Sequence, residues 1–302
     1  MNSRMFSDEE MAQLSRSPWV VAEEALAAGD RKAAETALSG LEAGCRSQMD
    51  RYVSWVANIF EGAAERGRPG GTAALVQTTR RFFAVSPDAP FLEPADPAAA
   101  ATAVFERSTG TTELGGALDE WLGSWRRTID LHRDWISALL GRIYQDGGPD
   151  ELEWTLRYCG RQGMAGAVAE HAGRPVRTQL EGFVHLLHGH FAELEVVEDD
   201  SKFVIEQDPC GTCTRQVTDG RFGPPLNLPM VTEAHTVTWN RGTTTIYRSH
   251  IPVWHVAMAI EAIGVPWPVN QCPHGLDAGV CRILLYKDPR NPEATAGVPT
   301  VG

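Results

Sequence analysis

Four of the six cysteines lie in the last third of this 302-residue chain, and their spacing favours metal chemistry. Cys210 and Cys213 form a CxxC pair in "DPCGTC", and Cys272 and Cys281 follow nearer the end of the chain. Zinc sites in proteins use thiolate and imidazole ligands, and a tight turn orders two thiolates at little cost in entropy. We therefore predict a zinc site with ligands drawn from these four cysteines and a nearby histidine.

The sequence leaves the complete ligand set of this zinc site open. His274 stands beside Cys272 in "QCPHG", so a closed structural site can have four cysteines or three cysteines and one histidine. A catalytic site keeps one position free for water or substrate. His250 is then a candidate ligand, with His255 and His235 as further choices, and each choice assumes that these segments meet in space.

A nucleophilic cysteine is the alternative that needs no metal. Cys210 would be the nucleophile, with His250 or His188 as the general base and Glu233 or Asp208 as the acid that orients the base. The glycine that follows Cys210 allows close approach of the backbone, and nearby amides can stabilise an oxyanion. This arrangement would suit acyl or amidine transfer.

A thioredoxin-like redox pair is the third interpretation of the CxxC motif. Such a pair needs a thiol of depressed pKa, and the N-terminus of a helix that begins at the motif normally supplies it. The following segment, "TRQVTDGRFGPP", contains two glycines and two prolines, which predict that no helix begins there. We therefore do not expect redox chemistry.

Three polar side chains share one helix face at the end of the N-terminal part. Glu181, His185 and His188 are spaced i, i+4 and i+7, and His190 follows just beyond them. Such a face can bind a divalent metal, or it can be a polar face in contact with water. We expect His185 to contact water and keep His188 as a candidate site residue, because it lies nearest the change from helical to strand-like sequence.

Composition restricts the partners. The net charge of −12 and the pI of about 5.2 argue against nucleic acids and anionic membranes, because proteins that bind phosphate groups usually concentrate lysine and arginine. The first residues lack a signal-peptide pattern, and no apolar window has the length of a membrane span. We expect a cytoplasmic protein with reduced thiols, in which the separate Cys45 and Cys159 are buried apolar residues.

The elements that must position these residues predict an α+β protein. Apolar residues recur at helical spacing through most of residues 1–190, which predicts a helical domain whose tryptophans pack in the core. Residues 191–302 have strand-like runs and one helix, which predicts a smaller α+β domain with antiparallel strands and one packed helix. This second domain carries the Cys/His cluster.

Individual elements follow from local patterns. Asp30 is a candidate N-cap for a long helix, and the Gly147–Pro149 segment is expected to end another. In the second domain we predict a hairpin over 194–198 and 202–207, strands at "TVTW" and "TTTIYRSH", a helix between Pro252 and Gly264, and a last strand from Cys281.

The segment from Leu194 to Pro289 resembles the L-2-amino-thiazoline-4-carboxylate hydrolase-like group and related uncharacterised bacterial proteins. The resemblance rests on the hairpin that leads into "DPCG", on "TEAHTVTW" and on "YRSHIPVWHVAMAIEAIGVPW". It implies hydrolysis of a small cyclic or amide-like compound through Cys210, with His250 close by. Cys213 and Ile251 stand where related chains are expected to have a glycine-rich continuation and a further cysteine.

Two functions therefore remain open. The first is a small-molecule enzyme, a hydrolase or lyase, with a zinc or thiol site between the two domains. The second is a non-enzymatic module that binds a ligand or a partner and contains a structural zinc site. An assembly role as a homodimer in bacterial biosynthesis is a further possibility. The sequence has no nucleotide-binding glycine fingerprint and no phosphate loop.

Overall fold

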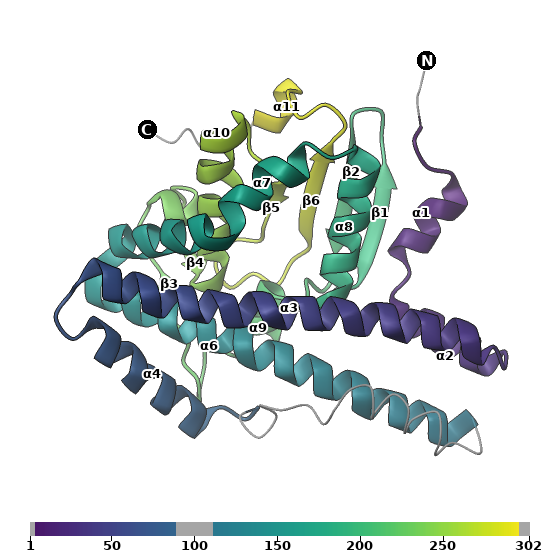
Figure 1. The fold of residues 1–302 in the computed structure, drawn as a ribbon, viewed down its shortest axis with the longest axis horizontal. Coiled ribbons are helices and arrows are strands. Elements are labelled where there is room, and N and C mark those ends of the chain that lie inside the picture. The colour runs from purple at the N-terminus through teal and green to yellow at the C-terminus, as the bar shows by residue number, and fades with distance from the viewer. Residues whose placement is uncertain (1–3, 89–110, 296–302) are drawn as a thin grey trace.

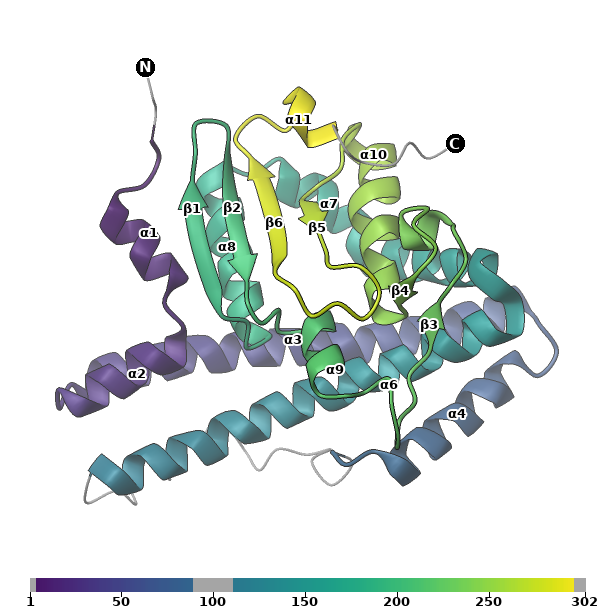
Figure 2. The ribbon, with the colours of Figure 1, turned by 180° about the vertical axis from the view of Figure 1, so that it is seen from behind.

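The N-terminal part of the chain is a layer of helices. The computed structural model describes residues 4–88 and 111–295. Two long helices, α3 and α6, lie side by side across the molecule, with α4 against α6 and α2 against α3 (Figures 1 and 2). The helices of this layer are α1 (Asp8–Ser15), α2 (Pro18–Ala27), α3 (Arg31–Arg66), α4 (Gly71–Val85) and α6 (Thr111–Cys159).

Polar caps and glycines set where these helices begin and end. Asp30 accepts a hydrogen bond from the Ala33 amide at 3.0 Å, so its predicted role as the N-cap of α3 is confirmed. Gly67 ends α3 in the left-handed conformation, which glycine adopts without strain. Gly148 has a φ of 73° and interrupts α6 within the predicted Gly147–Pro149 break.

A bent helical segment leads from α6 back toward the C-terminal part. It comprises η2 (Gly160–Met164), a π-helical turn, then α7 (Ala165–Ala172) and α8 (Val176–Gly189).

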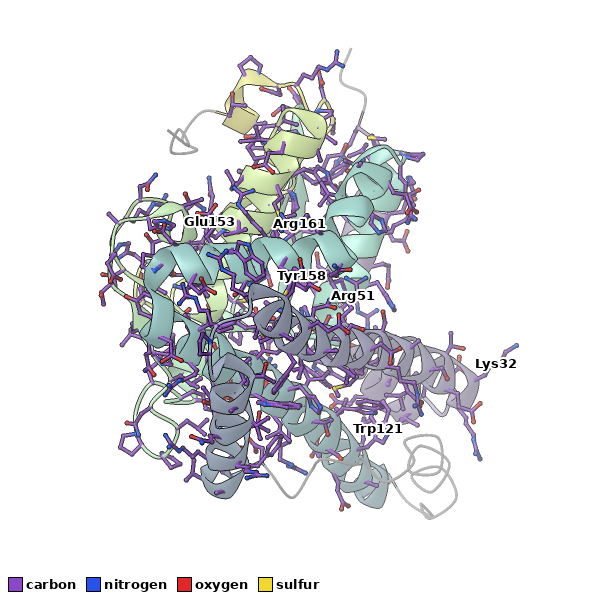
Figure 3. The ribbon with its side chains drawn as sticks, turned by 60° about the vertical axis from the view of Figure 1, so that its left-hand side comes forward. Lys32, Arg51, Trp121, Glu153, Tyr158 and Arg161 are labelled. Carbon is purple, nitrogen blue, oxygen red and sulfur yellow. The ribbon has the colours of Figure 1, made fainter. Side chains whose placement is uncertain are left out.

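The end of α6 packs closely on α3. Tyr158 of α6 contacts α3 at Gly62, where an added Cβ would lie 2.9 Å from the tyrosine ring (Figure 3). The absence of a side chain at Gly62 therefore lets α3 and α6 approach closely.

A four-stranded antiparallel sheet forms the centre of the C-terminal part, in the order β1-β2-β6-β5. Its strands are β1 (Leu194–Glu198), β2 (Lys202–Gln207), β5 (Val269–Gln271) and β6 (Cys281–Tyr286). The hairpin of β1 and β2 has the predicted bounds, and Cys281 opens the last strand of the sheet as predicted. The predicted α+β fold class is confirmed.

Helix α8 covers one face of this sheet (Figure 1). Alternate residues of β2 point toward it, and Phe203 and Ile205 are fully buried. They pack with Leu180 and Val184 of α8 and with Ile283 of β6 in one apolar cluster. Burial of this shared face fixes the strand register, because a slip by one residue would turn the apolar side chains outward.

The segment between β2 and β5 is mostly irregular, and two strand predictions there are wrong. "TVTW" forms a 3-10 turn, and of "TTTIYRSH" only two residues are in a strand. The Thr238 hydroxyl donates a hydrogen bond to the Glu233 carbonyl oxygen, and Trp239 and Asn240 have positive φ values. Local side-chain hydrogen bonds and a turn therefore replace the backbone hydrogen bonds of a strand pair. The elements are α9 (Cys213–Thr218), β3 (Met230–Val231), η3 (Thr236–Thr238), β4 (Thr244–Thr245), η4 (Tyr247–Ser249), η5 (Pro252–Ala257) and α10 (Met258–Ile263), with α11 (Pro292–Thr295) after the sheet.

One apolar cluster includes residues from both sides of the proposed boundary after residue 190. Tyr52 and Trp55 of α3 and Trp125 of α6 belong to it, together with Cys210 and Trp254. The site described below is therefore held by elements from both parts of the chain. The division into domains of residues 1–190 and 191–302 stays a prediction.

Candidate metal centre

Three thiols from separate segments meet at one end of the sheet. The Sγ atoms of Cys210, Cys213 and Cys281 all lie within 4.8 Å of one another, and those of Cys210 and Cys213 are 3.9 Å apart. All three residues are buried. Within the described ranges, no other group of three potential metal ligands lies this close. The three thiols can hold a metal ion.

The antiparallel sheet explains why these distant cysteines converge. Gln207, the last residue of β2, pairs with Cys281, the first residue of β6. The chain that leaves β2 therefore reaches Cys210 at the same end of the sheet where β6 begins. Gln271 of β5 pairs with Arg282, which places the following residue, Cys272, at this end too.

Helix α9 begins at the second cysteine of the CxxC motif, so the prediction that no helix starts there is wrong. Cys213 is its first residue, and the predicted helix breakers come later, with Gly220 in the left-handed conformation beyond the helix end. Two side chains of the helix, Arg215 and Gln216, are fully buried and bonded to α6. These tertiary contacts stabilise a helix too short to form alone.

Cys272 lies at the edge of the cluster. It is half-buried, and its thiol is near enough to Cys281 to contribute, after Cys213, to the raised pKa of that residue. It is not one of the three residues whose ligand atoms are all mutually close. The cluster therefore has three tightly grouped thiols and a fourth beside them.

A buried cation accompanies the thiols. Arg248 has no exposed surface and donates hydrogen bonds to the carbonyl oxygens of Pro273 at 2.6 Å and Gly275 at 3.1 Å. Its Nε and Nη2 have no hydrogen-bond acceptor of normal geometry. The guanidinium lies close enough to Cys213 to favour the thiolate form of that residue.

The thiols differ in how readily they ionise. Hydrogen bonds from Cys210 and Cys281 hold the pKa of Cys213 well below the usual value, and Arg248 lowers it further. The same hydrogen bond to Cys213 raises the pKa of Cys210 well above the usual value. The cluster thus concentrates negative charge on Cys213. The thiolate is the form of cysteine that binds metals.

His250 lies near the thiols in an aromatic environment. Its Nδ1 is 2.6 Å from the Tyr247 carbonyl oxygen, so Nδ1 carries the hydrogen and Nε2 is left as an acceptor. Its ring packs against Trp55, Tyr247 and Trp254, with centroid distances of 4.9 to 5.3 Å. Burial lowers the pKa of His250 to about 4, although the charge on Cys213 opposes this shift. The imidazole is therefore neutral at pH 7.

More polar groups lie buried next to His250. The hydroxyl groups of Tyr52 and Tyr247 are 3.1 Å apart, and the ring of His190 stacks on Tyr52 with a centroid distance of 6.2 Å. Both ring nitrogens of His190 and the hydroxyl of Ser249 are buried without a protein partner. Buried polar atoms of this kind usually bond to water or a ligand.

The other predicted site residues do not belong to the close group of thiols. Glu233 is exposed and accepts a hydrogen bond from Tyr144, and Asp208 is exposed. His274 is exposed, with its Nε2 3.5 Å from the Arg241 carbonyl oxygen. Their catalytic or ligand roles stay predictions.

The remaining predicted histidines contact other parts of the fold. His235 bonds to Asp150 at 3.0 Å, and Nδ1 of His255 is 3.3 Å from the Trp267 carbonyl oxygen. His188 packs against Trp19 and lines a separate cleft. The site roles of these histidines stay predictions too.

A buried ionic network beneath the cysteines was not found from the sequence. Asp130 of α6 accepts hydrogen bonds from Arg133 at 2.7 Å and from Arg215 of α9 at 2.6 Å. Asp134, also on α6, bonds to Arg133 at 2.9 Å and to Gln216 at 2.7 Å. All five residues are almost fully buried. The i, i+3, i+4 spacing of charges in the apolar helix segment "TIDLHRDWISALL" was the available signal.

This network holds the backbone of the CxxC loop. Arg133 donates to the carbonyl oxygen of Thr212, between the two cysteines, at 3.2 Å. Arg215 donates to the His190 carbonyl oxygen at 2.8 Å, and Gly211 packs directly against the same carbonyl. Residues of α6 and α9, together with the end of α8, therefore fix the backbone of the CxxC loop.

Comparison with protein-family models, with curated proteins and with solved structures found no match. Among the helices of residues 4–88 and 111–295, none combines the length and the apolar character needed to cross a membrane.

Proposed function

We propose that Cys210, Cys213 and Cys281 bind a zinc ion. The observation that carries the proposal is the mutual approach of the three Sγ atoms within 4.8 Å. Tetrahedral zinc with Zn–S bonds of about 2.3 Å requires sulfur atoms about 3.8 Å apart. The distance of 3.9 Å between Cys210 and Cys213 agrees with this requirement. An all-thiolate set suits a soft or borderline metal and does not suit magnesium or calcium.

We propose further that the zinc-bound protein is a small-molecule enzyme, a hydrolase or a lyase. Three protein ligands leave one position for water or substrate, and zinc at such a position supplies a Lewis acid. Nε2 of the neutral His250 can accept a proton nearby, and the Arg248 cation offsets the charge of the thiolates. The buried, unpartnered nitrogens of His190 can bond to a polar substrate.

The substrate class rests on the resemblance to the L-2-amino-thiazoline-4-carboxylate hydrolase-like group. That resemblance implies a small cyclic or amide-like compound. Incubation with 2-amino-thiazoline-4-carboxylate, followed by chromatography of the products, tests this part. Turnover by the wild type that Cys210→Ala abolishes would support it, and no turnover by zinc-loaded protein would reject this substrate.

A closed structural zinc site is the second candidate, and Cys272 is the observation that favours it. Its thiol lies beside Cys281 and completes a set of four cysteines. Such a site would stabilise the end of the sheet and would have no free position. The protein would then bind a ligand or a partner without catalysing a reaction.

Metal analysis of the purified protein tests both candidates. We expect about one zinc per chain in the wild type and loss of zinc in Cys210→Ala and Cys281→Ala. Cys159→Ala is the matched control, because Cys159 is also buried but belongs to no group of three close potential ligands in the described part of the chain. Zinc that survives Cys210→Ala would contradict the proposed site.

Cys272→Ala separates the two candidates. An open site keeps its zinc and its folded state in this variant, whereas a closed site loses affinity for the metal and loses stability with it. Zinc content and the urea midpoint should therefore be measured on the same preparation.

A further inference from the structure

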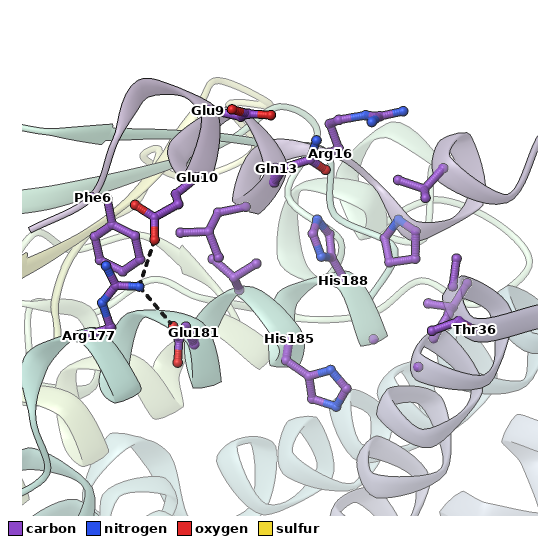
Figure 4. A pocket seen from close by; sticks show the side chains of 18 of the residues that line it. Phe6, Glu9, Glu10, Gln13, Arg16, Thr36, Arg177, Glu181, His185 and His188 are labelled. Atoms are coloured by element: carbon purple, nitrogen blue, oxygen red, sulfur yellow. Dashed lines mark hydrogen bonds and ion pairs between the residues drawn. The ribbon is translucent and has the colours of Figure 1, made fainter. Parts of the chain in front are cut away.

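A cleft of about 600 Å³ lies apart from the cysteine cluster, between the N-terminal helices and α8 (Figure 4). Its walls come from α1, the start of α2, the first turns of α3 and the outer face of α8. This volume is typical of sites for small organic molecules. Nothing in the proposed metal chemistry uses this cleft.

The interior of the cleft is mostly apolar. Leu14 and Val21 line it from the N-terminal helices, and Leu41 and Val184 line it from α3 and α8. Gly40 of α3 also faces it, and a Cβ added there would meet no atom within 4 Å. The cleft can therefore take the apolar body of a ligand without rearrangement.

The wall formed by α1 is tied to the rest of the molecule. The Glu198 carboxylate accepts hydrogen bonds from the backbone amides of Met5 at 2.7 Å and Phe6 at 3.1 Å. Arg177 of α8 donates to the Met5 carbonyl oxygen at 2.6 Å and to Glu10 at 3.1 Å. The cleft is thus a preformed feature of the fold.

Three carboxylates line this cleft, those of Glu9, Glu10 and Glu181, against two guanidinium groups. Its two guanidinium groups are already engaged: Arg177 pairs with Glu10 and Glu181, as Figure 4 shows, and Arg16 pairs with Glu24. The carboxylate of Glu9, at the mouth of the cleft, has no ion pair within the described residues. A ligand that brings donors and positive charge therefore complements the cleft.

His188 provides an acceptor inside the cleft. The residue is only 6% exposed, lines the cleft beside His185, and has no partner for its Nε2. Burial lowers the pKa of His188 to about 4, and the neighbouring His185 contributes to this shift, so the imidazole is neutral at pH 7. A neutral imidazole protonated at Nδ1 accepts a hydrogen bond at Nε2.

We propose that this cleft binds a small organic ammonium compound. The apolar body packs against the side chains from α1, α3 and α8, and the ammonium group donates to Nε2 of His188 and is attracted by the carboxylate of Glu9. The proposal goes beyond the proposed zinc enzyme and does not depend on it.

Titration calorimetry on the full chain tests the proposal with phenethylamine as the probe. A matched carboxylate, 3-phenylpropionate, and a matched alcohol, 3-phenylpropan-1-ol, have a similar apolar body. We expect the amine to bind at least about tenfold more tightly than the carboxylate, a difference of about 1.4 kcal/mol. Equal affinities for amine and carboxylate would overturn the proposal.

Two variants place the binding in this cleft. Gly40→Leu puts a bulky side chain into the open space and is expected to abolish binding of the amine. Gly182→Leu is the matched control, because Gly182 lies on α8 outside the cleft and also has open space at its Cβ. Equal binding by these two variants would overturn the proposal, and thermal melting of both checks that they are folded.

A third variant tests the role of the imidazole. His188→Phe keeps an aromatic ring and removes the acceptor, so we expect about a tenfold loss in amine affinity and no change for the alcohol. The same loss for both probes, or no loss for either, would contradict the assigned role of Nε2. Loss of amine binding in Cys210→Ala but not in Gly40→Leu would place the site at the thiols and reject the cleft.

Discussion

Replacement of Gly211 by alanine should disturb the cysteine cluster without removing a thiol. Gly211 lies between the two cysteines of the CxxC motif, and an added Cβ would stand 2.2 Å from the carbonyl oxygen of His190 and 2.9 Å from the Ala192 nitrogen. These are backbone atoms, which cannot rotate away. The loop must therefore move away from α8.

The size of this movement can be worked out from the contact. Real Cβ atoms stay at least 3.0 Å from such atoms, so the loop must shift by about 0.8 Å, the difference between 3.0 and 2.2 Å. Metal–ligand distances tolerate changes of only about 0.2 Å. Cys281, on β6, does not move with the loop. We therefore expect Gly211→Ala to lower zinc affinity by at least about tenfold and stability by about 1 to 3 kcal/mol.

Competition with a chromophoric zinc chelator gives the affinity, and urea unfolding followed by tryptophan fluorescence gives the free energy of unfolding. Gly182→Ala is the matched control, because its added Cβ meets no atom within 4 Å on a helix surface. We expect it to keep the wild-type zinc affinity and to be up to about 1 kcal/mol more stable. Wild-type zinc affinity in Gly211→Ala would refute the reasoning.

Three further predictions concern charged and titratable groups beneath the metal site and in the N-terminal cleft. Arg215→Met should cost about 3 to 5 kcal/mol in urea unfolding, because Asp130 loses a buried partner, and a cost below about 1 kcal/mol would contradict this. Glu198→Gln should speed hydrogen exchange in residues 5–16 by weakening the bonds to the N-terminal amides and to Lys287, and unchanged exchange would count against this anchor. The pKa of His188 falls from 6.5 to about 4 on folding, so its contribution of about 3 kcal/mol is complete above pH 6.5 and is lost as the pH falls through 4. His188→Phe should flatten the stability profile over this range, and an unchanged slope would contradict the assignment.

Local signals were sufficient for several of the regular elements. The hairpin of β1 and β2 follows from two β-branched runs joined by Asp199 and Ser201, and Asp199 accepts the hydrogen bonds that close the turn. Asp30 was recognisable as an N-cap because its side chain bonds to an amide only three residues away. Gly264 ends α10 in the left-handed conformation, as its place after the apolar helix predicts. Such features depend on neighbours in the sequence.

The convergence of the thiols was expected, but its cause was not visible in the sequence. The pairing of Gln207 with Cys281 joins two strands that are separated by 73 residues, 208–280. No periodicity encodes this pairing. Likewise, α9 exists because Arg215 and Gln216 find buried partners on α6, which local propensity cannot reveal. The glycines and prolines that argued against a helix lie beyond its end.

The buried charges were missed for a related reason. Asp130, Arg133 and Asp134 share one face of α6, a pattern that is usually a solvated surface. Here that face is covered by α9, so the charges pair with Arg215 and Gln216 in the interior. Only the tertiary arrangement distinguishes the two cases.

X-ray absorption spectroscopy at the zinc edge of the purified, full-length protein tests the central claim most directly. If Cys210, Cys213 and Cys281 bind zinc, the spectrum contains a shell of three or four sulfur atoms at about 2.3 Å, and a fourth, lighter atom accompanies three sulfurs when the site is open. A shell of nitrogen and oxygen atoms alone, or protein that takes up no zinc, would contradict the claim that these thiols form a zinc site.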